Sequence, residues 1–248
     1  MKKTVAIVLL VCLTTLLLTA CGNTPAIKNT PSIETSMVEK NAVPEPTQSP
    51  TIVPETSEST LGEGKVIVST FAELQTAVEN QDIAEIYVNS AIDTTSELSF
   101  ERNDDLTIHI EHEGTLTISE LFEAVGCSII NDGTISISKT FNRGITNLIN
   151  NGTITVKSGG KVSSGMSNTE NHGNFSVDAG GELFIERGSI FNNFDNLTNN
   201  GSISINDGGQ LNDEGGTIIN NGIIDLYSFF NGDIANITGT GTLNDNRE

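Results

Sequence analysis

The sequence predicts an all-β domain in which short strands wind into stacked coils, a parallel β-solenoid. Three observations support this prediction: a repeat of about twenty residues, apolar residues spaced by two within each repeat, and glycine-rich corners between the apolar runs. The repeat is marked by glycines spaced 19, 19, 21, 28, 21 and 19 residues apart, namely Gly114, Gly133, Gly152, Gly173, Gly201, Gly222 and Gly241.

The apolar columns define the inner face of each coil. The second residue after each glycine is apolar throughout: Leu116, Ile135, Ile154, Phe175, Ile203, Ile224 and Leu243. The fourth residue after it is also apolar, except for Asp245 in the last repeat. Since alternate residues of a strand share a face, each repeat is expected to place short strands around an apolar interior. Independent hairpins, the usual reading of one Asn-Gly, would not keep these columns in every repeat.

The corners carry a second regularity. The position two before the glycine is asparagine in five successive repeats, at Asn131, Asn150, Asn171, Asn199 and Asn220. An amide both donates and accepts hydrogen bonds, so these side chains are predicted to form one ladder from coil to coil. A further corner at Gly159-Gly160, Gly180-Gly181 and Gly208-Gly209 predicts a third wall.

The start of the domain shows signals for a cap. Thr70 and Glu73 have the spacing of a capping box, which predicts a helix that runs to about Asn80. Such a helix would cover the open end of the stack and block edge-to-edge association. The strand-like residues 85–88 then follow as a first coil.

The N-terminus has the features of a bacterial lipoprotein export signal. Lys2 and Lys3 precede a short apolar run that ends in Leu18-Thr19-Ala20-Cys21, a sequence that resembles a lipobox. We therefore expect residues 1–20 to be a signal peptide and Cys21 to carry lipid, which would hold the chain on the extracytoplasmic face of the cell membrane.

A tether is predicted to link the lipid to the domain. Residues 21–62 contain all six prolines and scattered apolar residues, so they are expected to be disordered. Residues 63–248 form the predicted domain. Loss of Lys2 and Lys3 leaves 10 basic and 32 acidic residues, a formal net charge of −22. Such a surface repels nucleic acid and anionic headgroups, which leaves the lipid as the expected membrane contact.

Two stretches resemble known families. The segment VSTFAELQTAVENQDIAEIYVNSAID looks like the N-terminal cap and first coil of pectate-lyase-like β-helix proteins, and NNGTITVKSGGKV is similar to the repeats of bacterial adhesins and autotransporter passenger regions. The resemblance covers residues 64–243 and implies a single-stranded right-handed β-helix. Families with this fold include polysaccharide lyases, hydrolases and non-catalytic surface proteins.

No catalytic group, metal site or cofactor is predicted. The enzymes of this fold use clustered acidic residues, and the nearest approach to such a cluster is Asp178 with Asp207, which are more simply corner aspartates. His109 and His112 are not expected to share a metal. Cys127 is the one cysteine of the predicted domain and is expected to be a small buried residue.

The expected function is a non-enzymatic surface protein that binds a glycan or a protein or acts as a spacer. The predicted binding face is the outward side of the strand after each glycine, with Thr115, Thr117, Thr134, Ser136, Thr153 and Thr155, continued by Asn174, Ser176, Ser202 and Ser204. The alternatives are an envelope polysaccharide lyase or glycoside hydrolase and, because of the Thr-x-Thr spacing, an ice-binding solenoid.

Overall fold

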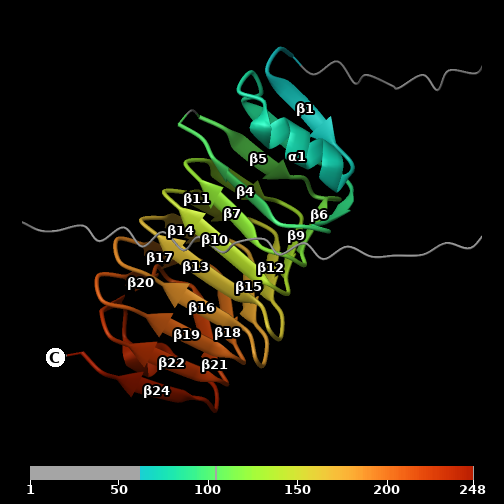
Figure 1. Ribbon diagram of the computed structural model, residues 1–248. Coiled ribbons are helices and arrows are strands. Elements are labelled where there is room, and N and C mark those ends of the chain that lie inside the picture. The colour runs from blue at the N-terminus through green and yellow to red at the C-terminus, as the bar shows by residue number, and fades with distance from the viewer. Residues whose placement is uncertain (1–61, 104, 248) are drawn as a thin grey trace, which may run out of the picture. The chain divides into compact units, whose positions relative to one another are not determined.

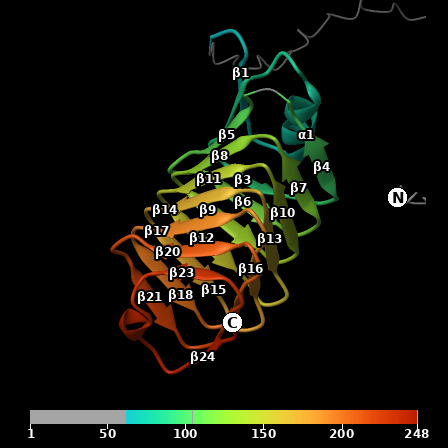
Figure 2. The same cartoon turned by 90° about the vertical axis from the view of Figure 1, so that its left-hand side faces the viewer.

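The computed structural model describes residues 62–103 and 105–247, and these residues form a right-handed parallel β-solenoid. Coils follow one another along a single axis from the N-terminal helix to the C-terminal strand (Figures 1 and 2). The predicted signal peptide, Cys21 and nearly all of the predicted tether lie outside the described residues. Among the described residues, no helix is long and apolar enough to span a membrane.

The strands of this region form three parallel sheets of nine, seven and eight strands, here called sheets A, B and C. Sheet A contains β1 (Lys65–Val68), β2 (Glu85–Val88), β5 (Thr107–Ile110), β8 (Ser128–Asn131), β11 (Asn147–Asn150), β14 (Asn168–Asn171), β17 (Ile190–Asn193), β20 (Gln210–Asp213) and β23 (Phe229–Asn231). Sheet B contains β3 (Ala91–Asp93), β6 (Thr115–Ile118), β9 (Thr134–Ile137), β12 (Thr153–Val156), β15 (Asn174–Val177), β18 (Asn196–Asn199) and β21 (Thr217–Asn220). Sheet C contains β4 (Leu98–Glu101), β7 (Phe122–Val125), β10 (Thr140–Gly144), β13 (Lys161–Gly165), β16 (Glu182–Ile185), β19 (Ser202–Ile205), β22 (Ile223–Leu226) and β24 (Thr242–Asp245).

The interior is made by the alternate residues that the sequence pattern places inward. In β12, for example, Ile154 and Val156 are buried while Thr153 and Thr155 face out and are partly exposed. Burial of each such aliphatic side chain contributes roughly 1.5–3 kcal/mol, and the same two positions recur in strand after strand. Phe122 and Phe141 stack in consecutive coils, with ring centroids 5.6 Å apart in an edge-to-face arrangement.

The N-terminal end is closed by α1 (Phe71–Glu79), as the capping box predicted. The Glu73 amide donates to Thr70 Oγ1, and the Glu73 carboxylate accepts from the Thr70 amide. Leu74, Ala77 and Val78 of this helix are buried against the first coil. The helix also receives support at its C-terminal end. The buried Arg102 guanidinium donates to the carbonyl oxygens of Val78, Asn80 and Ile83 at 2.8–3.0 Å.

The C-terminal end is less enclosed. After β23 the chain forms a short 3₁₀ helix, η1 (Ile234–Asn236), and then β24, whose partner is β22. Inward residues of this last coil, such as Phe230, Ile237 and Leu243, are only partly buried. In the described residues the apolar interior therefore extends to the last turn, where Ile234 of η1 is packed against it but is only partly buried.

One feature of the repeat differs from the prediction. The 28-residue interval between Gly173 and Gly201 contains four strands, β15 to β18, where the preceding interval contains three. As a result β15 pairs with β18, and the strand after Gly201, β19, joins sheet C instead of sheet B. Strands of all three sheets carry the same pair of inward apolar residues. The strand that follows the repeat glycine can therefore belong to sheet C after Gly201, where it belonged to sheet B before, and still pack in the interior.

Candidate functional site

The predicted hydroxyl-rich face lies on the outer side of sheet B. Its first column is Thr115, Thr134 and Thr153, which face one another in register on β6, β9 and β12. Its second column is formed by three residues in the same strands, Thr117, Ser136 and Thr155. All six side chains are partly exposed. We call these six residues the hydroxyl wall. They can donate and accept hydrogen bonds without adding charge.

The face continues differently from the prediction because of the shift at Gly201. Asn174 and Ser176 follow the hydroxyl wall on β15, and the Ser176 hydroxyl donates to Thr155 Oγ1 at 3.2 Å. The next pair is Asn196 and Thr198 on β18, so the assignment of Ser202 and Ser204 to this face was wrong. Those serines lie on the outer face of sheet C. The polar face ends at Thr217, which is beside Ile219 on β21.

The predicted asparagine ladder exists as two separate stacks. In sheet A, Asn131 donates to Asn150, Asn150 donates to Asn171, and Asn171 donates to Asn193, with distances of 2.7–2.9 Å. Asn199 and Asn220 form their own bond of 2.8 Å in sheet B. A single ladder through all five predicted residues was therefore wrong. Asn193 is the fourth residue of the sheet A stack because β17, and not β18, pairs with β14 there.

The amides in the ladder also satisfy backbone groups at the corners. Asn150 Nδ2 donates to the Asn174 carbonyl at 3.1 Å, and Asn171 Nδ2 donates to the Asn196 carbonyl at 2.9 Å. These side chains are fully buried. Their role is structural, since they hold the strands of one coil to the corner of the next.

A second ladder, which sequence reasoning missed, lies inside the corner between sheets C and A. Thr146 and Ser167 are buried, and each hydroxyl donates to a carbonyl of the preceding coil, Ala124 and Arg143, at 2.9 and 3.1 Å. The buried Ser189 hydroxyl in the next coil is within 2.5 Å of the Ser164 carbonyl. The available sequence signal was a small hydroxylated residue just after the corner residue in three successive coils, at Thr146, Ser167 and Ser189.

The same corner contains an unusual backbone conformation. Among the described residues, Ile145 and Met166 are the non-glycine residues with positive φ, at 53° and 50°. Their side chains are 61% and 65% exposed. Other coils place glycine here, with φ of 72° at Gly126 and 79° at Gly188. The corner therefore displays two large apolar side chains in a conformation that glycine adopts at lower cost.

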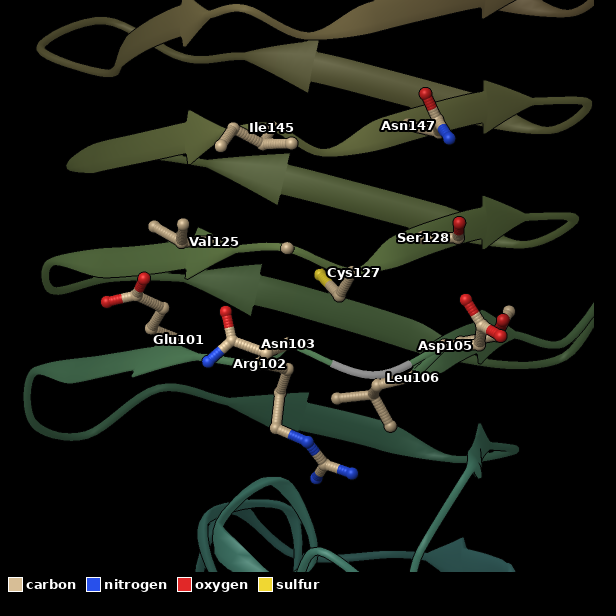
Figure 3. A pocket seen from close by; sticks show the side chains of 12 residues that line it. Glu101, Arg102, Asn103, Asp105, Leu106, Val125, Cys127, Ser128, Ile145 and Asn147 are labelled. Carbon is tan, nitrogen blue, oxygen red and sulfur yellow. The ribbon is translucent and has the colours of Figure 1, made fainter.

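A cavity of about 400 Å³ adjoins Ile145. Its apolar lining includes Leu106, Val125 and Cys127, and its polar lining includes Glu101, Asp105 and Asn147 (Figure 3). The Arg102 side chain turns from the cavity toward the helix. The cavity thus combines an apolar side with exposed carboxylates. We call this cavity, with Ile145 and Met166, the corner site.

Two buried groups lie near the corner site. Burial raises the pKa of the Cys127 thiol to about 11, so it is protonated at neutral pH, in keeping with a packed small residue. The Arg143 guanidinium is inside the coil, where burial lowers its pKa to about 10. Its Nε and Nη1 atoms have no hydrogen-bond partner within the described region, a costly arrangement for a buried cation.

The acidic and histidine residues considered as metal ligands lie apart. Asp178 follows β15 in sheet B and pairs with Lys157 at 3.5 Å, whereas Asp207 follows β19 in sheet C. Asp207 instead lines a C-terminal hollow with Tyr227 and Phe229. His109 stacks on Tyr87, with ring centroids 4.6 Å apart. No group of three His, Cys, Asp or Glu residues able to hold a metal ion occurs in the described part of the chain.

Comparison with known proteins found no matching family model, no matching curated protein and no matching solved structure.

Proposed function

We propose that this protein is a lipid-anchored, extracytoplasmic surface protein whose solenoid binds a glycan or protein partner without catalysing a reaction. The observation that supports this proposal is the hydroxyl wall, where three coils present hydroxyl groups in two straight columns. Parallel rows of uncharged donors and acceptors match the hydroxyl groups of an extended glycan or the polar groups of a peptide. The stacked coils hold these groups in fixed positions, which reduces the entropy lost on binding.

The remaining support for the proposal comes from the sequence. The lipobox-like segment ending at Cys21 predicts a domain outside the cytoplasmic membrane, and the proline-bearing tether of residues 21–62 would let it reach roughly 120 Å when extended. The resemblance to pectate-lyase-like and adhesin repeats is compatible with a non-catalytic role. A polysaccharide lyase or hydrolase remains the second candidate by that resemblance.

The anchor is tested with labelled palmitate in a bacterial host. Cys21→Ala is expected to remove the label from the chain and to release the protein from membranes or block its processing. The matched control is Cys12→Ala, which changes a cysteine within the predicted signal and is expected to keep the label. Label and membrane retention in Cys21→Ala would show that the lipobox assignment is wrong.

Binding is tested on glycan and peptide arrays. Replacement of Thr134, Thr153 and Thr155 by lysine is expected to abolish binding with folding unchanged, because these side chains point outward. The matched control replaces Ser202, Ser204 and Thr242 by lysine. These residues lie on the outer face of sheet C, so the control adds the same charge away from the hydroxyl wall. Equal binding by both triple variants would contradict a role for the hydroxyl wall. Turnover of a polyuronate by the wild-type chain would favour the lyase alternative.

A further inference from the structure

The strain at the corner site has no counterpart elsewhere in the described chain. A left-handed conformation is unfavourable for any L-residue and most unfavourable for a β-branched one such as Ile145. Glycine occupies this corner at Gly126 and Gly188, so the fold does not require a side chain here. Such conformations persist where the surrounding structure imposes them and gather at ligand-binding positions.

Internal packing does not account for these two residues. The Ile145 and Met166 side chains are 61% and 65% exposed, so most of their apolar surface faces solvent. They occupy equivalent positions in consecutive coils, since β10 and β13 pair in register from Thr140–Lys161 to Gly144–Gly165. Two neighbouring exposed apolar residues on a strained backbone form a surface suited to contact with another molecule.

The chemistry of the adjoining cavity defines what that molecule carries. The charged residues that line the cavity and are exposed are Glu101 and Asp105, both acidic. Leu106 and Val125 supply apolar lining beside Ile145. The exposed negative charge of the corner site therefore lies at the cavity, on Glu101 and Asp105.

We propose that the corner site binds a protein segment that carries an apolar side chain next to lysine or arginine. The apolar group packs between Ile145 and the cavity, and the basic group lies against Glu101 and Asp105. The full chain has a formal charge of −20, which also favours encounter with a basic partner. The corner site is independent of the hydroxyl wall and of the lipid anchor.

The test uses the full-length chain and a fluorescent synthetic peptide of alternating leucine and lysine. We expect binding to fall at least about tenfold in Ile145→Gly/Met166→Gly, because the apolar contact is lost while every charge is kept. A serine–lysine peptide should lose as much affinity on the wild-type chain. Glu101→Gln/Asp105→Asn should also weaken binding and reduce its dependence on salt.

Three results would overturn the proposal. The first is equal affinity of the wild-type chain and Ile145→Gly/Met166→Gly, and the second is equal affinity for the serine–lysine and leucine–lysine peptides. Either would mean that the peptide is attracted only by the general negative charge. The third is unchanged binding in Glu101→Gln/Asp105→Asn, which would place the basic group elsewhere. Circular dichroism of each variant separates these results from unfolding.

Discussion

Replacement of Ile145 and Met166 by glycine is predicted to stabilise the domain. At positions with a left-handed conformation, a change to glycine raises the free energy of unfolding by more than roughly 1 kcal/mol, because the backbone strain is removed. This figure already includes the opposing effect that glycine makes the unfolded chain more flexible. Each side chain is more than 60% exposed, so the burial lost is small, about 0.5 kcal/mol. The net gain is about 0.5–1 kcal/mol for each residue and about 1–2 kcal/mol for the double variant.

Urea unfolding followed by circular dichroism measures this change as a shift of the midpoint at constant slope. The matched control is Ile223→Gly, because Ile223 is 45% exposed but lies in the extended strand β22. There glycine should destabilise the domain by about 1 kcal/mol, since it adds chain entropy and removes a partial contact. If the corner variants are destabilised as much as the control, the strain assigned to this corner does not exist.

Three further predictions concern buried polar groups. Asn171→Ala should lower the free energy of unfolding by about 2–3 kcal/mol, because Asn150 and Asn193 each lose a hydrogen-bond partner. The control Asn174→Ala, at an exposed position of sheet B, should lower it by under about 0.5 kcal/mol. Equal losses in the two variants would show that the ladder has no structural role. Arg143→Met should raise the melting temperature, because two nitrogens of the buried guanidinium have no hydrogen-bond partner among the described residues. Arg102→Met should lower it, because three hydrogen bonds to carbonyl groups are lost. Burial raises the pKa of the Cys127 thiol from 9.0 to about 11, so the unfolded chain loses this proton at a lower pH than the folded one. The thiol's contribution to the free energy of unfolding is therefore complete below pH 9 and is smaller by about 1.4 kcal/mol at pH 10. Unfolding curves at pH 8 and 10 should show this loss in the wild type and not in Cys127→Ala.

Much of the fold follows from local rules that the sequence displays. The alternation around Ile135 and Ile154 places their side chains inside, and the structure buries both. The helix is read from Thr70 and Glu73 because a capping box depends only on neighbouring residues. The sheet to which a strand belongs is not decided by neighbouring residues in the sequence. All three walls accept the same apolar alternation, so the extra strand after Gly173 was invisible in the columns.

The hydroxyl wall was predicted because outward positions follow directly from inward ones. The corner site could not be found in this way. An apolar residue between two strands, such as Ile145, is normally expected to turn inward, yet Ile145 has a positive φ and is 61% exposed. Arg143 was missed for the opposite reason. A charged residue is expected outside, yet its position in β10 is an inward one between Phe141 and the corner.

Binding at the corner site can be mapped by the chemical shifts of the backbone amides. The isotope-labelled full-length chain is titrated with the leucine–lysine peptide, and each amide of the solenoid is followed. We predict shifts concentrated at residues 101–103, 105–107, 125–128, 144–147 and 165–167, with residues 134–136 of the hydroxyl wall unchanged. Shifts spread evenly over the acidic surface, or confined to another sheet, would show that the corner site does not bind the peptide.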